Sequence, residues 1–154
     1  MLLIEKVLLL KSTDIFMETA EPDLIDTAYI LEELQLDARS SIFNKGDRGS
    51  CMYIIHKGSV RIHDGDHTLA VLKENEIFGE LSLLDTETRS ASATCAEDCF
   101  LLKLDQEPFY EILSNNADVL KGILKTLCRR IRILDEKSAA QHAGLNPGRS
   151  QQSS

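Results

Sequence analysis

Tryptophan is absent from this chain of 154 residues, and aromatic residues make up only 5% of it. Binding that stacks many nucleic-acid bases on aromatic side chains is therefore excluded. The net charge of −8 also argues against a duplex DNA binder, although a basic patch on an acidic body stays compatible with one. No apolar run reaches the roughly 18 residues of a membrane span, and the first ten residues, with Glu5 and Lys6 among them, lack a signal-peptide pattern. We therefore expect a cytoplasmic protein with no membrane span and no nucleic-acid partner.

Catalytic and metal-binding patterns are scarce as well. None of the four cysteines has the C-x-x-C spacing of a zinc or redox site. Cys95 and Cys99 flank a predicted tight turn and could face each other as thiols or as a disulfide, so their redox state stays open. The segment from His63 to His67 is predicted to be an Asp-Gly hairpin turn rather than the ligand cluster that a metal-dependent barrel enzyme would need. Since no nucleophile is paired with a base either, we predict a protein that is not an enzyme and holds no metal or cofactor.

The charges are distributed unevenly. Before residue 115 the chain holds 22 of its 25 acidic residues, whereas residues 115–137 hold three acidic and six basic residues. The basic side chains between Lys125 and Arg132 are typical of the solvated face of an amphipathic helix, with nucleic-acid or membrane contact as the alternative. Residues 138–154 are rich in Ala, Gly, Ser and Gln, so we predict a disordered polar tail after a domain that spans residues 1–137.

Hydrophobic spacing divides this domain into three parts. Residues 1–33 are predicted to form N-terminal helices, the second opened by Pro22, because proline suits a first helical turn. Residues 34–104 change to a period of two, which is typical of short strands, over segments 41–43, 51–55, 60–62, 69–72, 91–94 and 100–104. In residues 105–137, Asp105 is expected to cap one helix, and a longer helix follows the break at Asn115. An apolar stripe on the longer helix packs on the barrel or forms the seam of a homodimer.

The predicted fold is therefore mainly β with flanking helices (α+β). We expect an antiparallel β-barrel or jelly roll of the double-stranded β-helix type, between N-terminal helices and a long C-terminal helix.

One segment of the barrel region combines residues that suit an anion. Phe78 ends a strand, Gly79 and Glu80 follow with a predicted helical turn, and Arg89 returns on the next strand. Glycine permits a sharp turn, free N–H groups at a helix start bind phosphate, and a guanidinium can pair with the same anion. Glu80 would repel a phosphate but can accept a hydrogen bond from a ribose hydroxyl. The segment predicts a sugar-phosphate pocket, and a strand-turn-strand with an exposed Glu–Arg pair is the alternative.

The sequence resembles the cyclic nucleotide-binding domain family from about Leu10 to Lys137. The resemblance rests on Ile42-Phe43-x-x-Gly46-Asp47, Met52-Tyr53-Ile54-Ile55-x-x-Gly58-x-Val60, Phe78-Gly79-Glu80-Leu81 and Arg89-Ser90-Ala91, the last two forming the family's phosphate-binding cassette. The long helix, with Asn116-x-Asp118-x-Leu120 and Arg129-Arg130, is similar to that of bacterial cyclic-AMP receptor transcription factors.

The resemblance implies roles for the matching residues. Arg89 would pair with the cyclic phosphate, Glu80 would hold the ribose 2′-hydroxyl, and Arg130 would pair with Glu80. Gly79 would let the backbone approach the ligand, which would place the nucleobase between the barrel and the last helix. Ser82 and Ser90, with neighbouring backbone N–H groups, would add donors. The residues expected to bind ligand are Gly79, Glu80, Leu81, Ser82, Arg89, Ser90, Ala91 and Arg130.

Departures from the family pattern limit what the resemblance implies. Thr88 stands where a proline is usual, Ser82 replaces a usual alanine, and Leu134 and Asp135 replace hydroxyl residues that read adenine. The departures at Leu134 and Asp135 weigh against selectivity for cyclic AMP more than against phosphate binding. We expect cyclic AMP rather than cyclic GMP as the ligand, with that choice left open. The alternative is a structural or docking domain that kept the fold without the ligand.

No helix-turn-helix pattern follows Lys137. We therefore expect a sensor domain without the DNA-binding domain, which relays ligand binding by movement of its C-terminal helix. It would act alone, as a homodimer through that helix, or with an effector domain of a larger parent chain.

Overall fold

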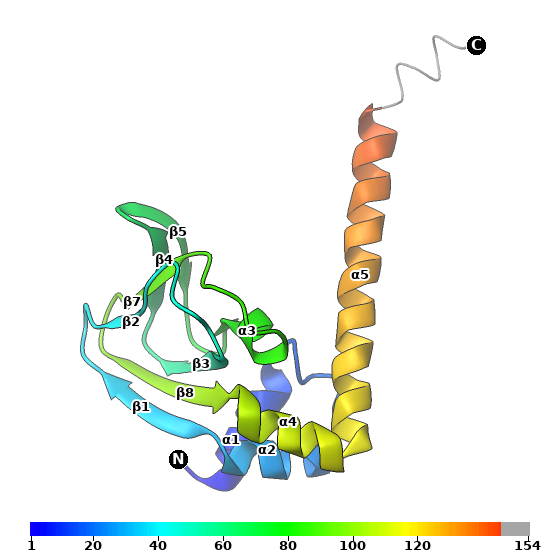
Figure 1. Ribbon diagram of the computed structural model, residues 1–154, viewed down its shortest axis with the longest axis horizontal. Coiled ribbons are helices and arrows are strands. Elements are labelled where there is room, and N and C mark those ends of the chain that lie inside the picture. Colours follow the sequence, from blue (N-terminus) through cyan, green and yellow to red (C-terminus); the bar gives the residue numbers. More distant parts are fainter. Residues whose placement is uncertain (146–154) are drawn as a thin grey trace.

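Two four-stranded antiparallel sheets form the β part of the structure, a computed structural model that describes residues 1–145 (Figure 1). The first sheet has the order β1 (Glu32–Leu36), β8 (Cys99–Asp105), β3 (Cys51–Lys57) and β6 (Ile77–Phe78). The second has the order β2 (Ser41–Phe43), β7 (Ser92–Cys95), β4 (Val60–Asp64) and β5 (His67–Leu72). They make the jelly-roll-like β-sandwich that the sequence predicts. Strands β1 and β6 were not among the predicted segments.

The two central strands of the first sheet, β8 and β3, are buried on both faces, which explains their apolar runs. Along β3, Met52 and Ile54 belong to a core shared with the helices, while Tyr53 and Ile55 belong to a second core between the two sheets. Because successive side chains of a strand point to opposite faces, a strand covered on both sides needs apolar residues at every position.

Helices flank the sandwich at both ends of the chain, as the sequence predicts. They are α1 (Leu3–Ser12), the 3-10 turn η1 (Glu21–Leu24), α2 (Ile25–Tyr29), the short α3 (Glu80–Leu84), α4 (Gln106–Asn115) and α5 (Ala117–Leu145). Asp105 occupies the N-cap position of α4, but its side chain makes no capping hydrogen bond. Phe16 and Phe109, which meet edge to face with ring centroids 5.7 Å apart, join the N-terminal segment to α4.

Helix α5 is longer than predicted. Its first half packs near α4 and η1, and its second half rises clear of the sandwich (Figure 1). Residues 138–145, predicted to be disordered, are helical as far as Leu145, so the prediction that the helix ends near Lys137 was wrong. Alanine and glutamine favour helix, and extending an existing helix avoids the cost of starting one. The rest of the predicted tail, residues 146–154, lies outside the described residues.

The predicted hairpin turn is present between β4 and β5. Asp64 pairs with His67 across it, and Gly65 has a φ of 57°. The four cysteines are free thiols: Cys51, Cys95 and Cys99 are buried and Cys128 is exposed. Of the helices described in residues 1–145, none is both long enough and apolar enough to cross a bilayer.

Candidate functional site

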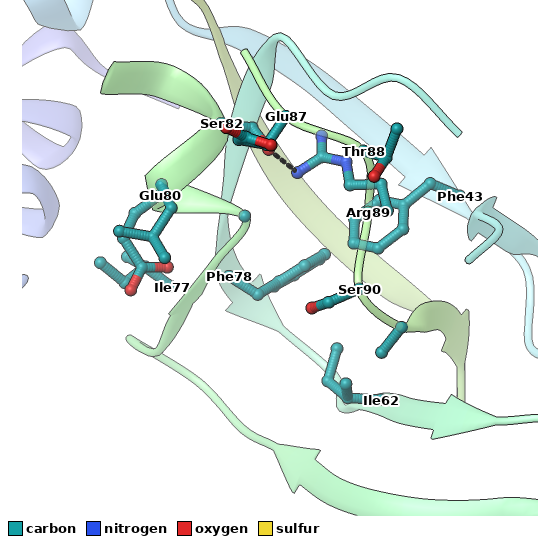
Figure 2. Close-up of a pocket in the computed structure, with 13 residues that line it drawn as sticks. Phe43, Ile62, Ile77, Phe78, Glu80, Ser82, Glu87, Thr88, Arg89 and Ser90 are labelled. Carbon is teal, nitrogen blue, oxygen red and sulfur yellow. Dashed lines mark hydrogen bonds between the residues drawn. The ribbon is translucent and has the colours of Figure 1, made fainter. Parts of the chain in front are cut away.

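A cavity of about 430 Å³ opens between β6, α3 and the segment that leads into β7. Seven of the eight residues predicted to bind ligand line it, namely Gly79, Glu80, Leu81, Ser82, Arg89, Ser90 and Ala91. Phe43, Ile62, Ile77 and Phe78 complete much of the wall with apolar surface (Figure 2). The fold thus brings the segment that begins at Gly79 and the segment that begins at Arg89 together around one cavity.

Arg89 is the most unusual side chain of this pocket, because it is charged and only 7% exposed. Its guanidinium donates hydrogen bonds to Ser82 Oγ at 3.1 Å and to the carbonyl oxygen of Cys51 at 2.9 Å, and it stacks on Phe43 with its central carbon 4.2 Å from the ring centroid. Within residues 1–145, no carboxylate lies within 4.0 Å of its nitrogens. Its positive charge is therefore held by neutral groups alone.

Two glycines make room for this guanidinium. A Cβ atom at Gly49 would lie 2.5 Å from Arg89 Nε, and one at Gly79 would collide with Arg89 Nη1. Gly79 also has a φ of 75°, in the left-handed region that residues with a Cβ rarely adopt. A side chain at either position would push Arg89 away from its place in the pocket.

Backbone groups add further donors around Arg89. Its own N–H donates to Asp47 O at 2.7 Å, and its carbonyl accepts from Gly46 N–H at 2.8 Å, which fixes the segment against the 46–49 loop. The N–H groups of Glu80 and Leu81, in the first turn of α3, have no acceptor among the described residues. The pocket therefore presents one guanidinium and free N–H groups to the same space.

Glu80 lies at the opposite side of the pocket from Arg89, and the two side chains point apart (Figure 2). Its Oε1 is 3.8 Å from Nη1 of Arg130, so α5 contributes a cation to the only acidic residue in the first turn of α3. Arg130 itself is not among the residues that line the cavity, and it reaches the pocket through Glu80. The pairing of Arg130 with Glu80 that the sequence resemblance implied is present as a long contact.

The two serines occupy different settings. Ser82 is buried, and its hydroxyl accepts from Arg89, so this side chain positions the guanidinium. Ser90 is exposed on the pocket wall, where Figure 2 shows its hydroxyl pointing toward Phe78. Leu81 is 65% exposed and Ala91 is buried.

Sequence reasoning missed several residues that hold the site in place. Cys51 binds Arg89 through a backbone carbonyl, which any residue could supply, so its identity gives no signal. Gln106 of α4 donates from Nε2 to the carbonyls of Ser82 at 3.3 Å and Leu83 at 3.2 Å, and thereby fastens α3. Phe43 was part of a quoted motif, but its stacking under Arg89 depends on the folded arrangement.

Metal chemistry finds no support in the described part of the chain. No three His, Cys, Asp or Glu side chains of residues 1–145 come together as they would around a metal ion. His63 instead contacts Gly65 O and Thr94 Oγ1, each at 2.8 Å, within the β4–β5 region.

Comparison with known proteins decides the family. Residues 33–116, more than half of the chain, match the sequence model of the cyclic nucleotide-binding domain. The chain belongs to the cyclic nucleotide-binding domain family. The matched segment contains the whole pocket but ends just before α5, so Arg130 lies outside it. Domains of this family are sensors that are typically non-catalytic, and some relatives that carry the domain are enzymes.

Relatives of this cyclic nucleotide-binding domain include both regulators and kinases. The cyclic AMP receptor protein of Thermus thermophilus is 37% identical over 120 residues, which are 74% of this chain and 56% of that protein. A cGMP-dependent protein kinase of Drosophila melanogaster is 32% identical over 118 residues, 71% of this chain and 13% of the kinase. The chain thus spans little more than half of the receptor protein's length.

The fold has solved counterparts as well. The N-terminal domain of a transcriptional regulator from Streptomyces coelicolor A3(2) matches with a TM-score of 0.78 and 26% identity, covering 84% of this chain and 93% of the other. The helices and the sandwich are therefore shared with the N-terminal domain of a transcriptional regulator.

Proposed function

We propose that this chain is a regulatory sensor that binds a 3′,5′-cyclic nucleotide, cyclic AMP in preference to cyclic GMP. The observation that carries the proposal is the buried Arg89, which has no carboxylate partner among the described residues. An unpaired buried charge is costly, so the folded pocket favours an anion that neutralises it. A cyclic phosphate brings one negative charge to this place and can accept hydrogen bonds from the guanidinium and the nearby N–H groups.

The remaining pocket residues suit the other parts of such a ligand. Glu80 carries a carboxylate that can accept a hydrogen bond from a ribose 2′-hydroxyl. Gly79 leaves the backbone open to close approach, Ser90 supplies a further hydroxyl, and the nucleobase would lie between the sandwich and α5. A volume of about 430 Å³ falls within the range of small-molecule sites.

The relay would run through Arg130. Because this residue of α5 contacts Glu80 at 3.8 Å, a ligand that engages Glu80 changes what the helix contacts. A ligand shifts a conformational equilibrium only when it binds two states with different affinity, and the Glu80–Arg130 contact provides such a difference. We therefore propose that ligand binding repositions α5, the output element of the domain.

The preference for cyclic AMP rests on the Thermus relative, which is a cyclic AMP receptor protein. The Drosophila kinase is named for cyclic GMP, so relatives of both kinds exist. Leu134 and Asp135 are exposed residues of α5. Neither residue is among those that line the pocket.

Calorimetric titration of the full chain with cyclic AMP and cyclic GMP tests the proposal. We expect binding of cyclic AMP and weaker binding of cyclic GMP. Arg89→Ala should weaken binding at least about 30-fold, since charge-assisted contacts are worth about 2–4 kcal/mol. Arg61→Ala is the matched control, because Arg61 lies on β4, its guanidinium donates to Thr68 Oγ1, and it is not among the residues that line the pocket. Failure of the wild type to bind either nucleotide at millimolar concentration would reject the proposal.

A second copy of the chain is the proposed partner of α5. Leu120, Leu124, Leu127, Ile131 and Leu134 repeat with the spacing of a coiled-coil seam. Four of them are at least 40% exposed, the exception being Leu127. Sedimentation equilibrium should show a dimer that Ile131→Asp dissociates, whereas a monomeric wild type would contradict this part of the proposal. An effector domain in a larger parent chain and a cytoplasmic location also stay predictions.

A second candidate function is a docking domain that kept the fold without the ligand. Thr88 before Arg89, and Leu134 and Asp135 on α5, favour it because they depart from the ligand-binding pattern. It predicts no change in the melting temperature with either nucleotide, whereas a ligand at 100 times its Kd adds about 2.7 kcal/mol to the free energy of unfolding.

A further inference from the structure

Two side chains of α4 hold the C-terminal end of the short helix α3. The last carbonyl groups of a helix have no partner within the helix and need donors from elsewhere. Gln106 Nε2 donates to the carbonyl oxygens of Ser82 at 3.3 Å and Leu83 at 3.2 Å. The Tyr110 hydroxyl donates to the carbonyl oxygen of Leu84. The carbonyls of the last three residues of α3 therefore all accept hydrogen bonds from α4.

The two side chains of α4 also contact each other. Gln106 and Tyr110 are four residues apart, so they lie on one face of the helix, and Gln106 Nε2 donates to the Tyr110 hydroxyl at 3.3 Å. Gln106 Oε1 accepts from Thr86 Oγ1 at 2.8 Å, and the backbone N–H of Gln106 donates to Ser50 O at 2.9 Å. We call Gln106 and Tyr110 the α4 clamp, because these bonds fix the pair against α3.

Ser82 connects the α4 clamp to the charged centre of the pocket. Its carbonyl accepts from Gln106, whereas its hydroxyl accepts from Arg89 Nη1 at 3.1 Å (Figure 2). Ser82 is only 6% exposed, so both bonds are shielded from water. The other contacts of the guanidinium, to Cys51 and to the Phe43 ring, come from the sandwich. The Ser82 hydroxyl is thus the contact of Arg89 that depends on how α3 is held.

Helix α3 does not need the clamp in order to form. Leu83 is fully buried in the core shared with the helices. The N–H of Ser82 donates to Gly79 O at 3.1 Å, and the N–H of Asp85 donates to Leu81 O at 2.8 Å. Loss of the clamp therefore changes the orientation of α3 about its buried leucine, and a change of orientation moves the Ser82 hydroxyl.

We propose that Gln106 and Tyr110 are positioning residues of the anion site: by holding the end of α3, they keep the Ser82 hydroxyl at Arg89 and the guanidinium in one position. The inference rests on the proposed binding of a cyclic nucleotide, and it adds α4 to the elements that set the affinity. A side chain that is ordered before the ligand arrives costs less to immobilise on binding. Without the clamp, the phosphate has to order Arg89 itself.

Calorimetric titration of the full chain with cyclic AMP gives the first test. Ordering one long side chain costs about two- to tenfold in affinity. Gln106→Met, which removes the donor but keeps the length and the helix propensity, should therefore weaken binding about fivefold, and Tyr110→Phe about threefold. Tyr29→Phe is the matched control and should keep the wild-type affinity, because Tyr29 is 72% exposed on α2 and is not among the residues that line the pocket.

A double-mutant cycle separates this positioning role from a general loss of stability. Because the clamp acts through the Ser82 hydroxyl, Ser82→Ala already removes its route to Arg89. Gln106→Met should then weaken binding by less than about twofold in the Ser82→Ala background, against about fivefold in the wild type. The same loss in both backgrounds overturns the inference, and so does wild-type affinity in both Gln106→Met and Tyr110→Phe.

A measurement without ligand distinguishes failure of this inference from failure of the proposed function. Hydrogen exchange of the Arg89 side-chain N–H groups, followed by NMR in isotope-labelled protein, reports how firmly the guanidinium is held. Exchange should be at least about fivefold faster in Gln106→Met than in the wild type, and unchanged in Tyr29→Phe. Failure of the wild type to bind either nucleotide rejects the proposed function, whereas equal exchange rates in the wild type and Gln106→Met overturn the role of the α4 clamp.

Discussion

The substitution Gly79→Ala tests whether the pocket depends on Arg89 staying where the structure places it. Gly79 combines a φ of 75° with contact to Arg89, and the added Cβ would meet Arg89 Nη1, with the Cys51 carbonyl oxygen 3.2 Å away. The methyl group therefore strains the backbone and displaces a buried guanidinium that sits between Ser82 and Phe43.

The expected magnitude has two parts. A residue with a Cβ in the left-handed region costs about 1–2 kcal/mol, and an extra methyl group in a filled interior costs about 1–3 kcal/mol. Gly79→Ala should therefore lower the free energy of unfolding by about 2–5 kcal/mol. For a chain of this size, that corresponds to a fall of about 5–15 °C in the melting temperature.

Gly65→Ala separates the two parts. Gly65 in the β4–β5 turn has a φ of 57°, and an added Cβ there would meet nothing within 4 Å. It should lose only the backbone part, about 1–2 kcal/mol, and keep nucleotide binding. Urea unfolding and calorimetric titration of both variants measure the two effects. If Gly79→Ala matched Gly65→Ala in both stability and binding, the reasoning about the Gly79–Arg89 contact would be wrong.

Three further predictions concern other parts of the fold. Gly122→Ala puts a methyl group against Thr19. Urea unfolding should show that the free energy of unfolding falls by about 1–2 kcal/mol, although alanine has the better helix propensity. An unchanged urea midpoint would contradict the close packing of α5 at this position. Burial alone would raise the pKa of Asp14, but hydrogen bonds and charges from Arg130 and Arg129 hold it below the ordinary value of 3.8. The ionised Asp14 therefore stabilises the fold above pH 3.8, and this contribution is lost as the pH falls through the lower pKa of the folded state. Between pH 5 and pH 2, the free energy of unfolding should fall more steeply for the wild type than for Asp14→Asn. Parallel curves of this free energy against pH would refute the prediction. Ellman's reagent should titrate one thiol, Cys128, rapidly in the native protein and four after unfolding, and a second rapid thiol would contradict the burial of the others.

Much of the fold was predictable because the elements with strong periodicity are also those that carry the core. The runs at 51–55 and 100–104 became β3 and β8, the two central strands of the first sheet. Strand β1 escaped prediction because Glu32, Glu33 and Gln35 interrupt its apolar residues at the sheet edge. Strand β6 has only two residues, too few to show any period.

The pocket residues were predictable from local motifs, whereas their partners were not. The spacing from Gly79 to Ala91 keeps the cassette within one short stretch of chain, so a motif can identify it. The partner of Arg130 is different: Asp14 is 116 residues away in sequence, and nothing in the order of residues marks it. The resemblance implied the contact with Glu80, but the shorter contacts are those to Asp14.

The C-terminal end of α5 is a second feature that the sequence did not predict. Composition predicted a disordered tail beyond Lys137, because residues 138–145 contain few large apolar residues and such a segment cannot pack into a hydrophobic core. These residues are helical although their side chains as far as Gly144 are exposed, because backbone hydrogen bonds within a helix need no core once the helix has been started.

The chain is acidic overall, yet the proposed ligand is an anion. The positions of the charged side chains around the pocket explain how the two are compatible. Among residues 1–145, Arg89 is buried with no carboxylate partner, while Glu80 at the start of α3 lies 3.8 Å from Arg130. The cation on α5 thus reduces the repulsion that Glu80 would exert on a phosphate at Arg89. Under the proposed function, a contact that draws α5 toward Glu80 should favour phosphate binding, and, because coupling between two sites is reciprocal, phosphate binding should favour that position of α5 to the same extent. The proposed relay from pocket to helix would therefore need no long chain of contacts, since Glu80 and Arg130 join the two at a distance of 3.8 Å.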